Sequence, residues 1–266
     1  MLGWAIVYLV MLEVTLHYVY YHCISRNLWV IFHEFPKESF FLPPWEVMLV
    51  GFYVLNYTYL KFLVIWRTAA AAALLDGIEC PENLPRCVCN NYTFAGFWRA
   101  WHASFHAWTL RYVYVPLGGR ATQHLSALPI FVFVGLWHDL ELRWTAWALS
   151  NAACLVAERA VLRRAASPAL APLRARWWWR YAAAAAAAGN IYLLILSNLA
   201  IQYGFAGGAA FVRAIFDPPP AWVARGDVAV THAVAGWWLW CGVLLMFRVR
   251  DTEAAARGRF AHPKKC

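Results

Sequence analysis

Long apolar segments separated by short polar joints dominate the pattern of this chain. A helix needs about 20 mostly apolar residues to cross a bilayer. By that measure about six segments qualify, at residues 2–21, 46–66, 125–137, 144–161, 181–200 and 228–249. The third segment is too short for a comfortable crossing, so we expect it to be re-entrant or a broken half-helix. The pattern therefore predicts an all-α polytopic integral membrane protein, a helical bundle with re-entrant and interfacial helices.

Small residues, prolines and charges refine this organisation. Alanine runs predict that a helix continues the second segment to Leu75 and that the fifth segment, with Ala182 to Ala188, packs closely against a neighbour. The Pro116–Gly119 segment predicts a helix stop, because proline lacks an N–H donor and glycine relaxes the backbone. With no internal repeat, residues 1–266 are expected to form a single membrane domain. Its tail, residues 250–266, is expected to be charged and soluble.

Composition and charge agree with a membrane protein. The chain is 62% hydrophobic and only 14% charged, unlike an ordinary soluble domain. Its formal net charge of +9 is best interpreted as loop charge at an anionic membrane surface, since no motif for base stacking or groove binding is present and no nucleic-acid partner is expected. The basic segments 159–180 and 248–265 favour the cytosolic side, and two predicted spans between them would place both on one side.

The cysteines do not form a regular disulfide framework. There are 7 of them, an odd number, so most are expected to be free thiols. Cys80, Cys87 and Cys89 lie in one loop, which leaves a zinc site open as an alternative, although no second paired set accompanies them.

Residues 97–112 have the pattern of one amphipathic helix. At 100° per residue, an aromatic stripe lies beside a polar stripe of Arg99, His102, His106 and Thr109. The aromatic stripe consists of Trp98, Trp101, Phe105, Trp108 and Tyr112. Such a helix suits the membrane interface, and the plain alternative is that headgroups simply hydrate its histidines.

A second candidate is the apolar run 130–137, which ends at His138. An ionisable group at membrane depth is costly and is a functional hypothesis by default. Histidine suits proton transfer because its pKa lies near neutrality, although a lone histidine can also serve as a hydrogen-bonded helix contact. Asp139 and Arg143, at i and i+4, are expected to pair.

Two chemical interpretations follow from the histidines. His102, His106 and His138 resemble a metal-ligand set, because histidines at i and i+4 share a helix face. Alternatively, His138 is a general base and His102 assists it. Arg99 on the same stripe would oppose a cation, so we prefer the general base and expect no metal.

Several ordered motifs carry a family resemblance. They are LDGI at 75–78, PEN at 81–83, RCV at 86–88, NNY at 90–92, FWRAWH at 97–102, RYVYVPLGG at 111–119 and WHDLEL at 137–142, with KKC at 264–266. In these motifs the chain resembles the C-terminal half of a membrane-bound O-acyltransferase (MBOAT), and more closely the glycerol-uptake-protein branch, relatives of Hedgehog acyltransferase. The family is usually longer at its N-terminus, so further spans are expected before Met1.

The resemblance implies transfer of a fatty acyl group from acyl-CoA, as co-substrate, to a hydroxyl or amine, with no bound cofactor. It makes His138 the catalytic histidine and His102 the second polar position. Substrate contacts are expected from Arg99, Trp101, His106, Arg111, Trp137 and Asp139. For this branch it further implies a lyso-GPI lipid as acceptor, in a multi-pass protein of the endoplasmic reticulum. The alternative is a glycerol transporter or another non-enzymatic membrane protein, but no paired inverted halves support it.

Overall fold

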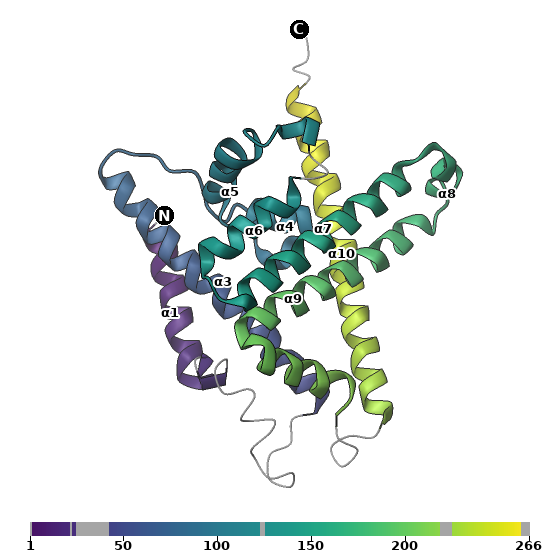
Figure 1. Ribbon diagram of the computed structural model, residues 1–266, viewed down its shortest axis with the longest axis horizontal. Coiled ribbons are helices and arrows are strands. Elements are labelled where there is room, and N and C mark those ends of the chain that lie inside the picture. Colours follow the sequence, from purple (N-terminus) through teal and green to yellow (C-terminus); the bar gives the residue numbers. More distant parts are fainter. Residues whose placement is uncertain (1, 22, 25–42, 123–125, 219–224, 262–266) are drawn as a thin grey trace.

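The computed structural model describes residues 2–21, 23–24, 43–122, 126–218 and 225–261. Within these ranges the chain is helical and contains no strand, as the hydrophobic pattern predicts (Figure 1). The α-helices are α1 Leu2–Tyr18, α3 Pro44–Leu75, α4 Phe94–Ala100, α5 Ala103–Thr109, α6 Ala127–His138, α7 Leu142–Ala166, α8 Ala171–Arg174, α9 Trp179–Phe216 and α10 Arg225–Ala261. A π-helical turn, Leu110–Tyr114, follows α5.

Three helices among the described residues are long and apolar enough to cross a bilayer. They are α3, α9 and the Asp227–Arg257 part of α10. The sequence pattern predicted about six spans, and the other candidates fall short for two reasons. α1 and α6 are apolar but have only 17 and 12 residues, and 12 residues extend only about 18 Å along a helix. α7 has 25 residues, but its second half carries Glu158, Arg159, Arg163 and Arg164.

Close helix contacts, several of them at small residues, hold the bundle together. In the first core cluster, α1, α3 and α9 meet around Val54, Leu199 and Phe211. Gly51 of α3 has no room for a Cβ, because such an atom would lie 2.8 Å from the ring of Phe211. In the second cluster, α4, α6, α7 and α9 surround Phe94 and Trp147.

The alanine run at the start of α9 packs as predicted. Ala184 and Ala188 are buried against Val243 of α10. Small side chains let these two spanning helices approach closely in lipid. α9 then continues beyond the predicted span, with a kink at Gly204, whose φ of 70° and ψ of 179° are not helical.

The charged end of the chain continues a spanning helix. α10 runs without a break through residue 250 to Ala261, so the first part of the predicted tail is helical. Figure 1 shows this yellow helix crossing the whole molecule and ending above α4 and α5.

Candidate active site

His102 lies at a sharp break between two short helices. Trp101 is extended, with a ψ of 121°, and His102 is left-handed, with a φ of 49° and a ψ of 59°. His102 is the only non-glycine residue in the described ranges with a positive φ. The prediction of one continuous helix over 97–112 is therefore wrong, and its polar stripe does not extend across the break. Residues forced into this region cost free energy and are concentrated at functional sites.

A distant asparagine stabilises the break. The backbone carbonyl of Asn83 accepts a hydrogen bond of 3.0 Å from the N–H of Ala103, and its side-chain Oδ1 accepts one of 2.9 Å from the N–H of Ser104. These donors begin α5 and would otherwise lack partners inside the helix. Helix periodicity misses this, because the partner comes from a loop about 20 residues away.

A buried carboxylate fixes the start of α4. Glu158 of α7 accepts hydrogen bonds from the backbone N–H groups of Phe94 at 2.6 Å and Ala95 at 3.1 Å. Asn190 of α9 donates a third, at 2.7 Å. A carboxylate at a helix N-terminus satisfies orphan donors and complements the helix dipole. Sequence analysis missed Glu158 as a site residue, although a single acid within the apolar run 144–161 was an available signal.

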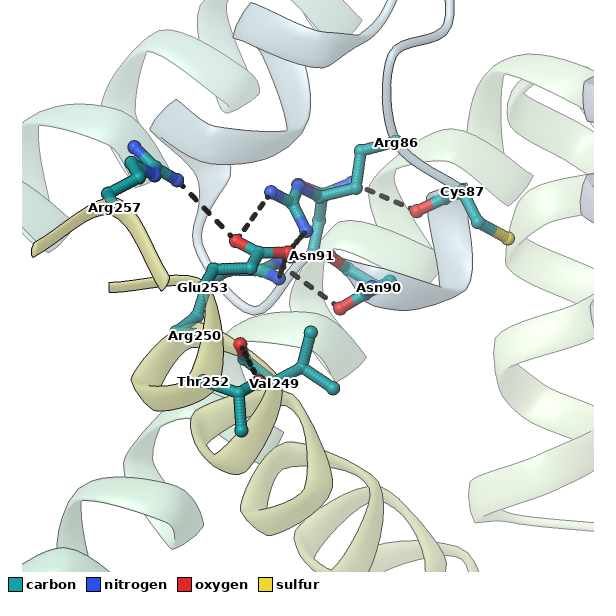
Figure 2. A network of polar contacts seen from close by, with 9 residues as sticks. All are labelled: Arg86, Cys87, Asn90, Asn91, Val249, Arg250, Thr252, Glu253 and Arg257. Carbon is teal, nitrogen blue, oxygen red and sulfur yellow. Dashed lines mark hydrogen bonds and ion pairs between the residues drawn. The ribbon is translucent and has the colours of Figure 1, made fainter. Parts of the chain in front are cut away.

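The loop that carries Asn83 is itself held by the end of α10 (Figure 2). The Arg86 guanidinium donates two hydrogen bonds of 3.1 Å to the Glu253 carboxylate. Arg250 donates to the Asn90 carbonyl at 2.7 Å, and Arg257 lies 3.7 Å from Glu253. The loop is therefore fixed to the spanning helix α10. Because Asn83 of this loop stabilises the break at His102, α10 supports His102 indirectly.

His102 and His138 come from different elements but share one aromatic cluster. The His102 ring lies between Trp66 and Phe105, at centroid distances of 4.7 and 5.4 Å. Trp137 connects the two histidines, with its ring centroid 6.4 Å from that of His102 and 4.9 Å from that of His138. These rings form an apolar wall that contains two titratable groups.

His138 is the last residue of α6 and is held by stacking. Its ring lies parallel to Trp144 at 4.5 Å and meets the edge of Trp147 at 5.6 Å. The rest of the side chain is exposed, and no residue of the described ranges hydrogen-bonds to its ring nitrogens. Partial burial lowers the pKa of His138, and the nearby His102 lowers it further. A neutral ring with an accessible nitrogen can accept a proton.

The other predicted residues divide into two groups. Trp101 joins the cluster through Phe62 and Trp66, at 5.6 and 5.8 Å, and Trp137 joins it through His102. Arg99 and His106 lie near one another outside it, where burial and then the Arg99 charge lower the pKa of His106. Arg111 is exposed and forms no ion pair with the described residues.

The expected pairing of Asp139 with Arg143 is wrong. The Asp139 carboxylate accepts a hydrogen bond of 2.7 Å from the N–H of Leu140, and Arg143 pairs with Glu141. The reason is that α6 ends at His138 and Asp139 is extended, so the two residues do not share one helix face.

The metal alternative gains no support from the geometry. Across the described segments, no three His, Cys, Asp or Glu side chains meet as a metal site requires. Within the cysteine loop, a hydrogen bond from Cys89 lowers the pKa of Cys87, and Cys89 also lies 3.3 Å from Asn56 Oδ1.

Two cavities lie away from the histidines. One, of about 520 Å³, borders the second half of α9 near Arg213 and Asp217. The other, of about 460 Å³, lies between α7 and the start of α9. Neither of these two cavities is lined by His102 or His138.

Comparisons with known proteins agree with the motifs. Residues 3–201 match the model of the MBOAT, membrane-bound O-acyltransferase family. The chain is 34% identical over 249 residues to membrane-bound O-acyltransferase GUP2 of Saccharomyces cerevisiae, covering 92% of this chain and 37% of that protein. It is 44% identical over 136 residues to membrane-bound O-acyltransferase gup1 of Schizosaccharomyces pombe, covering 51% and 22%.

A more distant relative is protein-cysteine N-palmitoyltransferase HHAT of Mus musculus, 32% identical over 175 residues, which covers 62% of this chain and 34% of that protein. The chain thus spans little more than a third of the length of these relatives at most. The matched region nevertheless includes both histidines, the loop that supports His102, the spanning helix α3 and the part of α9 up to residue 201. The chain therefore belongs to the membrane-bound O-acyltransferase family.

Proposed function

We propose that this chain transfers a fatty acyl group from acyl-CoA to a lipid hydroxyl, with His138 as general base and His102 assisting. The observation that carries the proposal is the aromatic cluster in which Trp137 contacts both histidines. The family membership supports acyl transfer as the reaction class.

The arrangement suits this chemistry in three respects. His138 has a lowered pKa and ring nitrogens without a hydrogen-bond partner in the described ranges, so it is neutral and able to accept a proton near pH 7. The stacking of His138 on Trp144 and of His102 on Trp66 fixes both rings. The surrounding apolar rings would hold an acyl chain and limit hydrolysis.

In the proposed acyl transfer, His138 takes up one proton and gives it back. The acceptor hydroxyl oxygen attacks the thioester carbonyl carbon while its proton passes to His138. The tetrahedral intermediate collapses to an ester and breaks the C–S bond. The departing coenzyme A thiolate takes the proton from His138, which restores the neutral ring. His102, close enough to lower the pKa of His138, would orient the acceptor or the carbonyl.

For the acceptor we propose a lyso-GPI lipid, reacylated at its glycerol hydroxyl in the endoplasmic reticulum. This acceptor is what the resemblance of the motifs to the glycerol-uptake-protein branch implies, and the similarity over 92% of the chain to a yeast membrane-bound O-acyltransferase supports that branch. Arg99 and Arg111, both exposed, would meet donor phosphates or lipid headgroups.

The decisive experiment reconstitutes the full chain in liposomes with radiolabelled acyl-CoA and a lyso-GPI lipid. We expect His138→Ala to abolish labelled product while expression and thermal unfolding stay unchanged. His17→Ala is the matched control, because His17 is an exposed histidine of α1. Normal acylation by His138→Ala would refute the assignment. Donor-independent glycerol flux that survives His138→Ala would instead favour the transporter alternative.

A further inference from the structure

Six arginines gather in one short segment with no acidic residue. They are Arg159, Arg163, Arg164, Arg174, Arg176 and Arg180. The carboxylate just before the segment, Glu158, is buried and bound to the start of α4. Of the six, Arg180 pairs with Asp251 at 2.8 Å. Arg164, Arg174 and Arg176 are exposed and form no ion pair with a described carboxylate, so the segment presents these three positive charges to its surroundings.

This segment forms a helical hairpin at the edge of the molecule. Figure 1 shows α7 and α9 running side by side toward α8, away from the rest of the bundle. Arg174 closes the turn, because its guanidinium donates to the carbonyls of Ala165 and Ser167, the latter at 2.8 Å. The arginines are thus presented on an ordered scaffold.

The hairpin also contains an apolar groove of about 460 Å³. Its lining consists of Ala160, Val161, Arg164, Ala165, Leu170 and Trp179. Arg164 is the only charged residue of this lining and is exposed. No described residue forms an ion pair or a side-chain hydrogen bond with it. A lone guanidinium beside an apolar groove matches a ligand with an anionic head and a hydrocarbon tail.

The groove lies at the start of spanning helix α9, and this position indicates that membrane lipids are the ligands available to it. Trp177 and Trp178 are exposed, 81% and 37%, and directly precede spanning helix α9. Tryptophans at the end of a spanning helix lie at the headgroup level of a bilayer. The groove, with Trp179 in its wall, therefore opens where phospholipid headgroups and the upper parts of acyl chains are found.

We propose that this hairpin binds an anionic phospholipid of the surrounding bilayer. Arg164 holds the phosphate, the neighbouring arginines favour a net negative headgroup, and an acyl chain lies in the groove beside Leu170 and Trp179. A zwitterionic lipid lacks the net charge that Arg164, Arg174 and Arg176 would attract, and a soluble polyanion would leave the apolar groove empty. This site is separate from the histidine cluster and does not depend on the proposed reaction.

The test uses the full chain in neutral detergent and fluorescent phosphatidylserine or phosphatidylcholine, with binding followed by energy transfer from tryptophan. We expect phosphatidylserine to bind more tightly. Arg164→Gln should weaken phosphatidylserine binding by roughly tenfold, because it removes one charge-assisted contact to the phosphate, and should weaken phosphatidylcholine binding as well, because that lipid carries the same phosphate. Arg248→Gln, an exposed arginine of α10 outside the groove, is the matched control and should bind normally.

A second variant tests the groove itself. Ala160→Phe fills the space beside Arg164, so it should weaken phosphatidylserine binding while unfolding at the wild-type temperature. Equal binding of both lipids, or normal binding by Arg164→Gln, would overturn the proposal. Displacement by inorganic phosphate alone would make this a simple anion site. Stronger displacement by acyl-CoA than by unlabelled phosphatidylserine would make the groove a donor site, and either result would reject the phospholipid assignment.

Discussion

Glu158 on α7 accepts a hydrogen bond of 2.6 Å from the backbone N–H of Phe94, the first residue of α4. Both residues are buried, Phe94 completely and Glu158 with 9% of its surface exposed. This contact joins the helix before His102 to the helix after His138. It makes a residue outside both motifs a structural support of the candidate site.

Replacing Glu158 with alanine should destabilise the protein. The change leaves the N–H groups of Phe94 and Ala95 without their partner and removes one of the two hydrogen bonds of the Asn190 amide, and an unsatisfied buried group costs about 1–3 kcal/mol. Thermal unfolding in detergent measures the loss. Glu13→Ala, at an exposed glutamate of α1, should stay near wild type. Equal melting temperatures for the two variants would contradict the role of Glu158.

Replacing His102 with glycine and with alanine should separate the role of its backbone conformation from the role of its side chain. Both remove the imidazole, but only glycine accepts a φ of 49° without strain. His102→Gly should therefore be more stable than His102→Ala by about 1 kcal/mol. Both variants should lose acyl transfer, as measured with the reconstituted chain. Activity retained by His102→Gly would mean that the left-handed backbone, and not the ring, is what the site needs.

The pH profile of acyl transfer should report the state of His138. Its folded-state pKa is lowered from 6.5, by partial burial and then by His102. A general base works in its neutral form, so the rate should be full near pH 7 and fall as the pH drops through a midpoint below 6.5. His102→Asn removes a source of positive charge, so it should move this midpoint to higher pH. An acid limb that is identical in both proteins would argue against electrostatic coupling of the two histidines.

The ion pair of Arg86 and Glu253 should affect activity more than stability. Both side chains are partly exposed, so breaking the pair should cost little folding stability. The pair fixes the loop whose Asn83 stabilises the break at His102, so Glu253→Gln should lower kcat clearly while the unfolding temperature hardly changes. The double exchange Arg86→Glu with Glu253→Arg tests this contact and should recover part of the lost rate. Arg257→Gln is the matched control. Arg257 makes a looser contact of 3.7 Å with Glu253, so this variant should lower kcat only slightly.

The sequence by itself determined the helical class, the spanning character of three segments, the close packing of the alanine run and the family, because these follow from local composition and ordered motifs. It also selected His102 and His138 as candidates. The tertiary structure decided how they meet, since Trp137, the neighbour of His138 in the sequence, contacts His102 only because α6 packs against α5 through Phe105. The break at His102 depends on Asn83, and the start of α4 depends on Glu158. Periodicity describes one helix at a time, whereas hydrogen bonds from distant segments decide where a helix begins and ends.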